Sequence, residues 1–166
     1  MIALFALGLV YLVLLALDLV GVRPAALRTH RAKLRVGLAA MFLLAAVGRL
    51  ASPETLLPMI PASWPLRYEA LYVSGLFEVL GAIGLLVPGL RRPAGLGLAL
   101  LLVLVFPANV YVALNNLQIE GYPGSPFYQW ARLPIQAVLI WLSLWTSQTA
   151  HQAEPLPQHE AVARAA

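Results

Sequence analysis

A single acidic residue, Glu78, lies inside an otherwise apolar stretch of the chain, Tyr72–Val87 (YVSGLFEVLGAIGLLV). Ionisable groups near the middle of a bilayer are rare and usually mark a ligand site, a proton pathway or a buried ion pair. An isolated buried carboxylate would take up a proton, whereas an arginine within about 4–6 Å would hold it ionised. Glu78 is therefore the first candidate for chemistry, and both protonation states stay open at this point.

Four further polar side chains are expected to approach Glu78 from the same half of a helix bundle. Arg49 ends one apolar segment, and Asn109 lies in the outer half of another. Arg132 and Gln136 are four residues apart, so they share one face of a helix. The sequence therefore predicts a ligand-binding or proton-relay site, with no catalytic residue assigned, formed by Glu78, Arg49, Asn109, Arg132 and Gln136.

The neighbours of Glu78 on its own helix face are all small. Residues three and four apart share a face, which places Ser74, Gly75, Gly81 and Ala82 beside it. Small residues let another helix approach closely, so this face is expected to point into the bundle. The same arrangement allows a purely structural role, in which Glu78 pairs with an arginine and the amide side chains hold helices together. Both interpretations stay open.

The composition indicates an integral membrane protein. Hydrophobic residues make up 61% of the chain and charged residues 11%, whereas about 25% of residues are charged in soluble domains. Mean hydropathy is +0.81. About 20 apolar residues cross a bilayer, which predicts five spans in one all-α domain over residues 1–146. These spans are Ile2–Val22, Leu34–Leu50, Tyr68–Leu90, Pro93–Leu114 and Leu133–Trp145.

The ends and charges of the chain suggest its orientation. The first span has no Lys or Arg before it and no clear cleavage site after it, so we expect a retained helix rather than a secretory signal. Most basic residues fall in the loop Arg23–Arg35, in Arg91 and Arg92, and in the tail, which predicts an outside N-terminus and a cytoplasmic C-terminus. The tail, residues 147–166, is expected to be disordered. These loop arginines explain the net charge of +4 and could bind anionic lipid head groups, so no nucleic-acid partner is expected.

Three local features complete the expected layout. Asp18 is expected to pair with nearby Arg23. The segment Ser52–Leu66 holds four prolines, which prevent a regular helix and favour a lid over the outer mouth of the bundle. An outer belt of interfacial aromatic residues is predicted. Its members are Trp64, Tyr68, Tyr72, Tyr122, Tyr128 and Trp130.

The chain offers little redox or metal chemistry of its own. It has no cysteine, which excludes dithiol exchange and thiolate metal sites within it. His30, His151 and His159 all lie outside the predicted spans, so neither a metal site nor a haem between membrane histidines is predicted. No cofactor is evident, and any redox role would depend on a bound molecule such as a quinone.

Several short motifs occur in a fixed order along the chain: PETLLPMIP (53–61), SGLFE (74–78), LLVP (85–88) followed by Arg91-Arg92, VFPANVY (105–111) and WARLPIQ (130–136). This combination resembles the DoxX family of small bacterial membrane proteins over roughly Val36–Trp145. The resemblance implies a four-helix core, to which Ile2–Val22 adds one helix, in the bacterial cytoplasmic (inner) membrane. Many DoxX proteins carry His-Phe where this chain has Arg49-Leu50.

Some DoxX proteins are linked to quinone-coupled oxidation of sulfur compounds. The resemblance therefore implies a quinone- or lipid-linked redox membrane subunit, with the bilayer, a quinone or other hydrophobic molecule and a redox partner protein as its partners. The alternative is a non-enzymatic binding or assembly protein for a hydrophobic ligand or partner helix, in which Glu78 pairs with an arginine only structurally. A proton-coupled carrier is disfavoured because the chain has no internal repeat. The residues do not decide whether the chain is an enzyme.

Overall fold

The computed structural model describes residues 2–19, 27, 29–119 and 125–148, and all regular structure in these ranges is helical. This confirms the predicted all-α class for the described residues. The five long helices are α1 (Ile2–Leu19), α2 (His30–Ala51), α4 (Arg67–Leu86), α5 (Arg91–Leu114) and α6 (Pro126–Ser147). The three short ones are α3 (Pro53–Leu56), η2 (Leu57–Met59) and η3 (Pro88–Leu90). The predicted tail, apart from its first two residues, lies outside the described residues.

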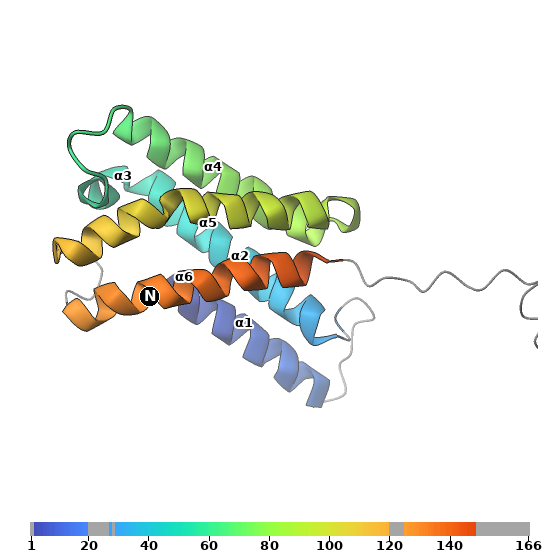
Figure 1. Cartoon of the computed structure of the whole chain (residues 1–166). Helices are drawn as coiled ribbons and strands as arrows, with labels where there is room; N and C mark the ends of the chain where they lie inside the picture. Colours follow the sequence, from blue (N-terminus) through green and yellow to red (C-terminus); the bar gives the residue numbers. More distant parts are fainter. Residues whose placement is uncertain (1, 20–26, 28, 120–124, 149–166) are drawn as a thin grey trace, which may run out of the picture.

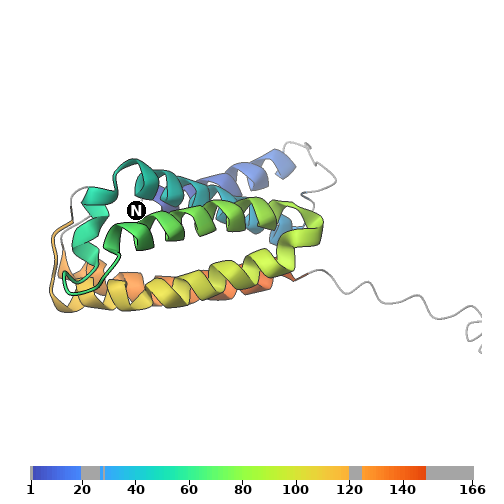
Figure 2. The same cartoon turned by 90° about the horizontal axis from the view of Figure 1, so that it is seen from above.

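Four of the long helices form a bundle and the fifth lies against its outside. Neighbouring pairs are α2 with α4, α4 with α5, and α5 with α6, while a smaller contact between α2 and α6 closes the ring (Figures 1 and 2). Helix α1 packs along α2. The main core lies between these helices and includes Leu38, Phe42, Leu85 and Leu98.

Among the described residues, three helical segments are long and apolar enough to cross a membrane: His30–Ala51, Arg67–Leu86 and Pro88–Leu114. The apolar part of α1 is shorter, Leu4–Leu19. Many large apolar side chains on the outer faces of the bundle, such as Leu80 and Leu104, are more than half exposed. Exposed apolar faces of this kind suit contact with lipid.

Two helices begin earlier than the apolar pattern predicts, because a side-chain cap starts each of them. Thr29 precedes α2 and its hydroxyl accepts a hydrogen bond from the backbone of Ala32. Ser125 precedes α6 and accepts one from the backbone of Tyr128, with Pro126 at the first helical position. Serine and threonine at this position satisfy backbone donors that the first helical turn leaves unpaired. The first turn of α2 is charged and that of α6 contains proline and glutamine, so neither stands out in a hydropathy window.

The face of α4 that carries Glu78 points into the bundle, as predicted. Ser74, Glu78 and Ala82 are 7%, 5% and 0% exposed. A methyl group added at Gly81 would lie 2.5 Å from the side chain of Leu98 on α5. This face therefore depends on small residues to bring the helices together.

The accessory helix α1 is tied to the bundle by a buried charge. Lys33 of α2 is 2% exposed and forms an ion pair with Asp18 of α1. Sequence reasoning expected Arg23 as the partner of Asp18, and Arg23 lies outside the described residues. The sequence does not indicate Lys33 as the partner of Asp18, because an ion pair between two helices depends on how the helices pack.

The proline-rich segment Ser52–Leu66 is more helical than predicted. It forms two short turns, α3 and η2, each with a proline at its first or second position. Proline has no N–H to donate, but the first turn of a helix needs none, so the residue is tolerated there. The prediction that the prolines prevent a regular helix here agrees with these two short, separate turns.

Candidate functional site

A cavity of about 290 Å³ lies in the half of the bundle near α3. Most of its walls are apolar, with Leu71, Val105 and Ile135 among the lining residues. All five predicted site residues line it, and Ser74 joins them. This volume is close to the lower end of the range for small-molecule sites, about 300–1,000 Å³. The cavity is therefore large enough for a small head group.

The wall formed by α2 and α4 carries an ion pair. Arg49 Nη2 lies 3.1 Å from Glu78 Oε1, and Arg49 Nη1 donates a hydrogen bond to Ser74 Oγ at 2.8 Å. Ser74 in turn donates to the carbonyl oxygen of Leu71 at 2.9 Å. The arginine comes from the last turn of α2 and the other two side chains from one face of α4. We call Arg49, Ser74 and Glu78 the charged group.

The wall formed by α5 and α6 carries a chain of hydrogen bonds through two amides. Arg132 Nη2 donates to Asn109 Oδ1 at 3.1 Å, and Asn109 Nδ2 donates to Gln136 Oε1 at 2.8 Å. Gln136 Nε2 then donates to the carbonyl oxygen of Leu102 at 2.5 Å. We call Arg132, Asn109 and Gln136 the amide group. It links α5 to α6 at two levels.

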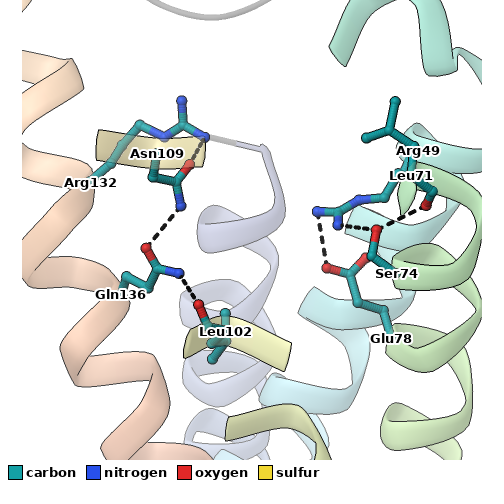
Figure 3. A network of polar contacts seen from close by, with 8 residues as sticks. All are labelled: Arg49, Leu71, Ser74, Glu78, Leu102, Asn109, Arg132 and Gln136. Carbon is teal, nitrogen blue, oxygen red and sulfur yellow. Dashed lines mark hydrogen bonds and ion pairs between the residues drawn. The ribbon is translucent and has the colours of Figure 1, made fainter. Parts of the chain in front are cut away.

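Figure 3 shows the two groups facing each other from different sides of the bundle, with the drawn hydrogen bonds running within each group. The sequence predicted one constellation around Glu78, but the structure brings only Arg49 into an ion pair with it. The reason is the order of the helices, because α2 is a neighbour of α4, while α6 packs mainly on α5. Asn109, Arg132 and Gln136 lie on the facing wall.

Two buried atoms of the charged group have no hydrogen-bond partner among the described residues. They are Glu78 Oε2, an acceptor, and Arg49 Nε, a donor. Buried polar atoms in proteins are almost always hydrogen-bonded, so an unpaired one needs water or a ligand. The charged group thus offers one acceptor and one donor beside a mostly apolar cavity.

The segment between α2 and α4 covers part of the cavity. Leu56, Met59, Ile60 and Trp64 line it, as the predicted lid requires. Arg67, at the start of α4, holds the segment in place, since its Nη2 donates to the carbonyl oxygens of Leu57 at 2.7 Å and of Ile60 at 2.9 Å. A single guanidinium thereby fixes the turn that closes this side of the cavity.

Residues 38–147 match the family model described as Domain of unknown function (DUF8561). The chain belongs to this family. Neither the curated proteins nor the solved structures contain a match to the chain. The DUF8561 domain runs from the middle of α2 to the end of α6, so it includes both groups of the cavity and leaves α1 outside.

Tyr128, a residue of the DUF8561 domain, lines the cavity, although the sequence predicts a different role for it. Tyr128 was predicted to anchor the outer aromatic belt, but it is 9% exposed, lines the cavity and has its ring centroid 5.9 Å from the guanidinium carbon of Arg132. Positions 128, 132 and 136 are four apart, which would have placed Tyr128 on the same face. Trp64, Tyr68, Tyr72 and Trp130 are about half exposed, and Tyr122 lies outside the described residues.

The site also contains partners that sequence patterns did not indicate. Ser74 was noted only for its small size, yet it accepts a hydrogen bond from Arg49. The carbonyl of Leu102 accepts one from Gln136 in the turn that precedes Pro107. In the part of the chain that the structure describes, no group of three or more His, Cys, Asp or Glu residues could hold a metal ion. The DUF8561 cavity has a mostly apolar lining with a few polar side chains, which makes it a candidate site for an organic molecule.

Proposed function

We propose that the protein binds the head group of a quinone or a similar lipid-soluble molecule in this cavity, as the membrane subunit of a redox system. One observation carries the proposal: an apolar cavity between helices has an unpaired carboxylate oxygen and an unpaired guanidinium N–H on one wall, at Glu78 and Arg49. Ligand sites combine a mainly apolar surface with a few well-placed polar groups.

The donor and acceptor set suits a molecule that can carry carbonyl or hydroxyl groups. Arg49 Nε can donate to a carbonyl oxygen, and Glu78 Oε2 can accept from a hydroxyl. The amide group provides a second polar surface across the cavity, at Asn109 and Gln136. A ring with an oxygen on each of two opposite edges could form hydrogen bonds with both walls. The apolar side chains would exclude water from the ring.

A quinone supplies its own electron chemistry, so the chain needs only to bind and orient it and to move protons. Among the described residues that line the cavity, Glu78 is the one carboxylate. Its role in the proposal is to hold a proton next to the bound ring, while Arg49 fixes the position of the carboxylate through Oε1. Lining leucines and isoleucines would contact the ring faces.

The proposal also includes the finer membrane arrangement. Helices α1 and α6 are proposed to cross the bilayer with the three candidate spans, giving five spans, an outside N-terminus and a cytoplasmic C-terminus in the bacterial inner membrane. The distribution of basic residues supports this orientation. Kinship with DoxX proteins is proposed on the motifs shared with that family, among them the segments around Glu78 and Asn109.

The test is to identify the small molecules that co-purify with the gently solubilised protein. We expect the wild type to carry a quinone and Glu78→Gln to retain about tenfold less, because a buried hydrogen bond to a charged group contributes about 1.5–3 kcal/mol. The matched control is Glu69→Gln, the same substitution at an exposed position in the first turn of the same helix. It should retain the wild-type amount.

An ultraviolet difference spectrum before and after borohydride addition separates a bound quinone from a redox-inert lipid. If the wild type and both variants carried only bulk phospholipid, the ligand proposal would be wrong. The alternative would then be preferred: a binding or assembly protein in which the ion pair between Arg49 and Glu78 is a structural lock. The 3.1 Å separation and the additional bond from Arg49 to Ser74 favour that alternative.

A further inference from the structure

The end of the bundle opposite the cavity gathers arginines around the last turn of α6. Arg35 of α2 donates through Nε to the carbonyl oxygen of Thr146 at 2.9 Å. Arg31, one turn earlier, donates through Nη1 to the carbonyl oxygen of Gln148 at 3.3 Å. The last carbonyls of a helix have no helical partner and carry partial negative charge, so both contacts are favourable.

A third arginine reaches the same turn from α5. A methyl group at Gly95 would overlap the side chain of Ser147, so the first turns of α5 lie directly against the end of α6. Arg91 is four residues before Gly95 and shares its helix face. Arg31 and Arg35 of α2 and the first turn of α5, with Arg91, are therefore grouped around the end of α6.

These arginines have more donors than the described residues satisfy. Arg91 makes no hydrogen bond or ion pair within the described ranges, and its buried Nε has no partner there. Arg35 uses only Nε, which leaves both Nη groups without a bond to any described residue. The one described acid at this end, Asp18, is paired with Lys33. The planar guanidinium group can bind a carboxylate or a phosphate through two parallel N–H···O bonds.

The surroundings indicate the depth of lipid head groups. The guanidinium carbon of Arg31 lies 4.7 Å from the ring centroid of Trp145, and Trp145 stacks on Trp141 at 5.7 Å. Tryptophan is enriched where hydrocarbon meets head groups, and arginines of this kind extend toward the same layer. The candidate spans that contain Arg35 and Arg91 both begin at this end.

We infer that Arg35 and Arg91 form a binding site for the phosphate group of an anionic phospholipid, beside the last turn of α6. The positive charge, the unused donors and the interfacial position all fit this ligand. The phosphate site lies at the opposite end of α2 from Arg49. If the phosphate site proved wrong, the proposal for the cavity would be unaffected.

The experiment measures lipids retained by the full chain. The protein is equilibrated with equal amounts of phosphatidylglycerol and phosphatidylcholine, and the bound lipids are counted by native mass spectrometry. We expect the wild type to prefer phosphatidylglycerol. Arg91→Gln should reduce that preference about fivefold, the effect of one basic residue near an anionic surface. Arg91 makes no hydrogen bond or ion pair with the described residues, so this variant should change the melting temperature little.

Arg92→Gln is the matched control, because it removes the same charge at the adjacent, exposed position. A diffuse basic surface predicts equal losses in both variants, whereas a site predicts a loss in Arg91→Gln alone. Equal losses, or no preference in the wild type, would overturn the inference. Displacement of the lipid by excess inorganic phosphate would identify the free ion as the ligand and overturn the lipid assignment.

A second measurement uses the wild-type chain, so its result does not depend on how a variant folds. Hydrogen exchange of the backbone amides in the last turn of α6 should be slower in phosphatidylglycerol nanodiscs than in phosphatidylcholine nanodiscs, because a bound phosphate would hold Arg35 against Thr146. Equal exchange rates in the two nanodiscs would contradict the site.

Discussion

The two walls of the cavity hold their polar groups in different ways. On the wall of α2 and α4, a formal ion pair joins Arg49 to Glu78 and leaves one buried oxygen and one buried N–H unpaired. On the wall of α5 and α6, two neutral amides connect Arg132 to a backbone carbonyl through successive bonds of 3.1, 2.8 and 2.5 Å. The carboxylate of Glu78 has an oxygen without a partner among the described residues, whereas the amides of Asn109 and Gln136 are bonded to each other and within α5 and α6.

This difference assigns separate roles to the walls. Amide side chains do not ionise, so only the charged group can take up or release a proton through a carboxylate. The amide group instead donates to the backbone carbonyl of Leu102 on α5, and such interhelical bonds contribute about 0.6–2 kcal/mol each in membranes. We therefore expect substitutions in the charged group to affect both ligand binding and stability, and those in the amide group to affect mainly stability.

The largest effect should come from reversing one charge of the ion pair. Arg49→Glu would place two carboxylates together at a site where Glu78 is 5% exposed. Breaking a buried pair in this way costs about 3–5 kcal/mol. We expect a large loss of thermal stability in detergent. Arg92→Glu, the same reversal at an exposed position, should leave the melting temperature unchanged.

The charge-swapped double variant Arg49→Glu/Glu78→Arg sharpens the comparison. It should regain much of the stability lost in Arg49→Glu, since opposite charges again face each other. It should not regain the ligand, because the donor and the acceptor have exchanged helices. Full recovery of both properties would mean that the pair acts only as a lock.

The sequence predicted the helices well because apolar length and small-residue faces are local properties. Burial of Ser74 and Ala82 beside Glu78 followed from their three- and four-residue spacing. Residue spacing could not show whether Arg49 or Arg132 pairs with Glu78, because the sequence places both arginines in the same half of the bundle. Only the packing order of the helices, which is a tertiary property, brings α2 against α4.

Depth along a helix was easier to predict than rotation about its axis. The aromatic-belt rule places Tyr128 near one end of the bundle, but it does not predict which face of the helix carries the side chain. Its spacing from Arg132 and Gln136 contained that information. The sequence similarly predicts that Lys33 lies in a loop. In the structure Lys33 belongs to α2, which begins after Thr29, and it forms an ion pair with Asp18.

An intermediate effect is expected from breaking the amide group. Gln136→Leu removes the acceptor for Asn109 and the donor to the carbonyl of Leu102, so we expect a loss of about 1–2 kcal/mol in unfolding free energy. Ligand retention should change less than in Glu78→Gln. Gln148→Leu, at an exposed position, should change stability by less than about 0.5 kcal/mol. A greater ligand loss in Gln136→Leu than in Glu78→Gln would reverse the roles assigned to the walls.

The smallest effect is expected at Ser74. Its hydroxyl accepts from Arg49 at 2.8 Å and donates to the carbonyl of Leu71 at 2.9 Å, so it holds the guanidinium without being part of the ion pair. Ser74→Ala removes both hydrogen bonds and should lower the unfolding free energy by about 1 kcal/mol. The ion pair itself survives, so ligand retention should fall by less than in Glu78→Gln. Ser63→Ala, at an exposed position, is the control, and a ligand loss in Ser74→Ala as large as in Glu78→Gln would show that the orientation of Arg49, rather than the carboxylate, controls binding.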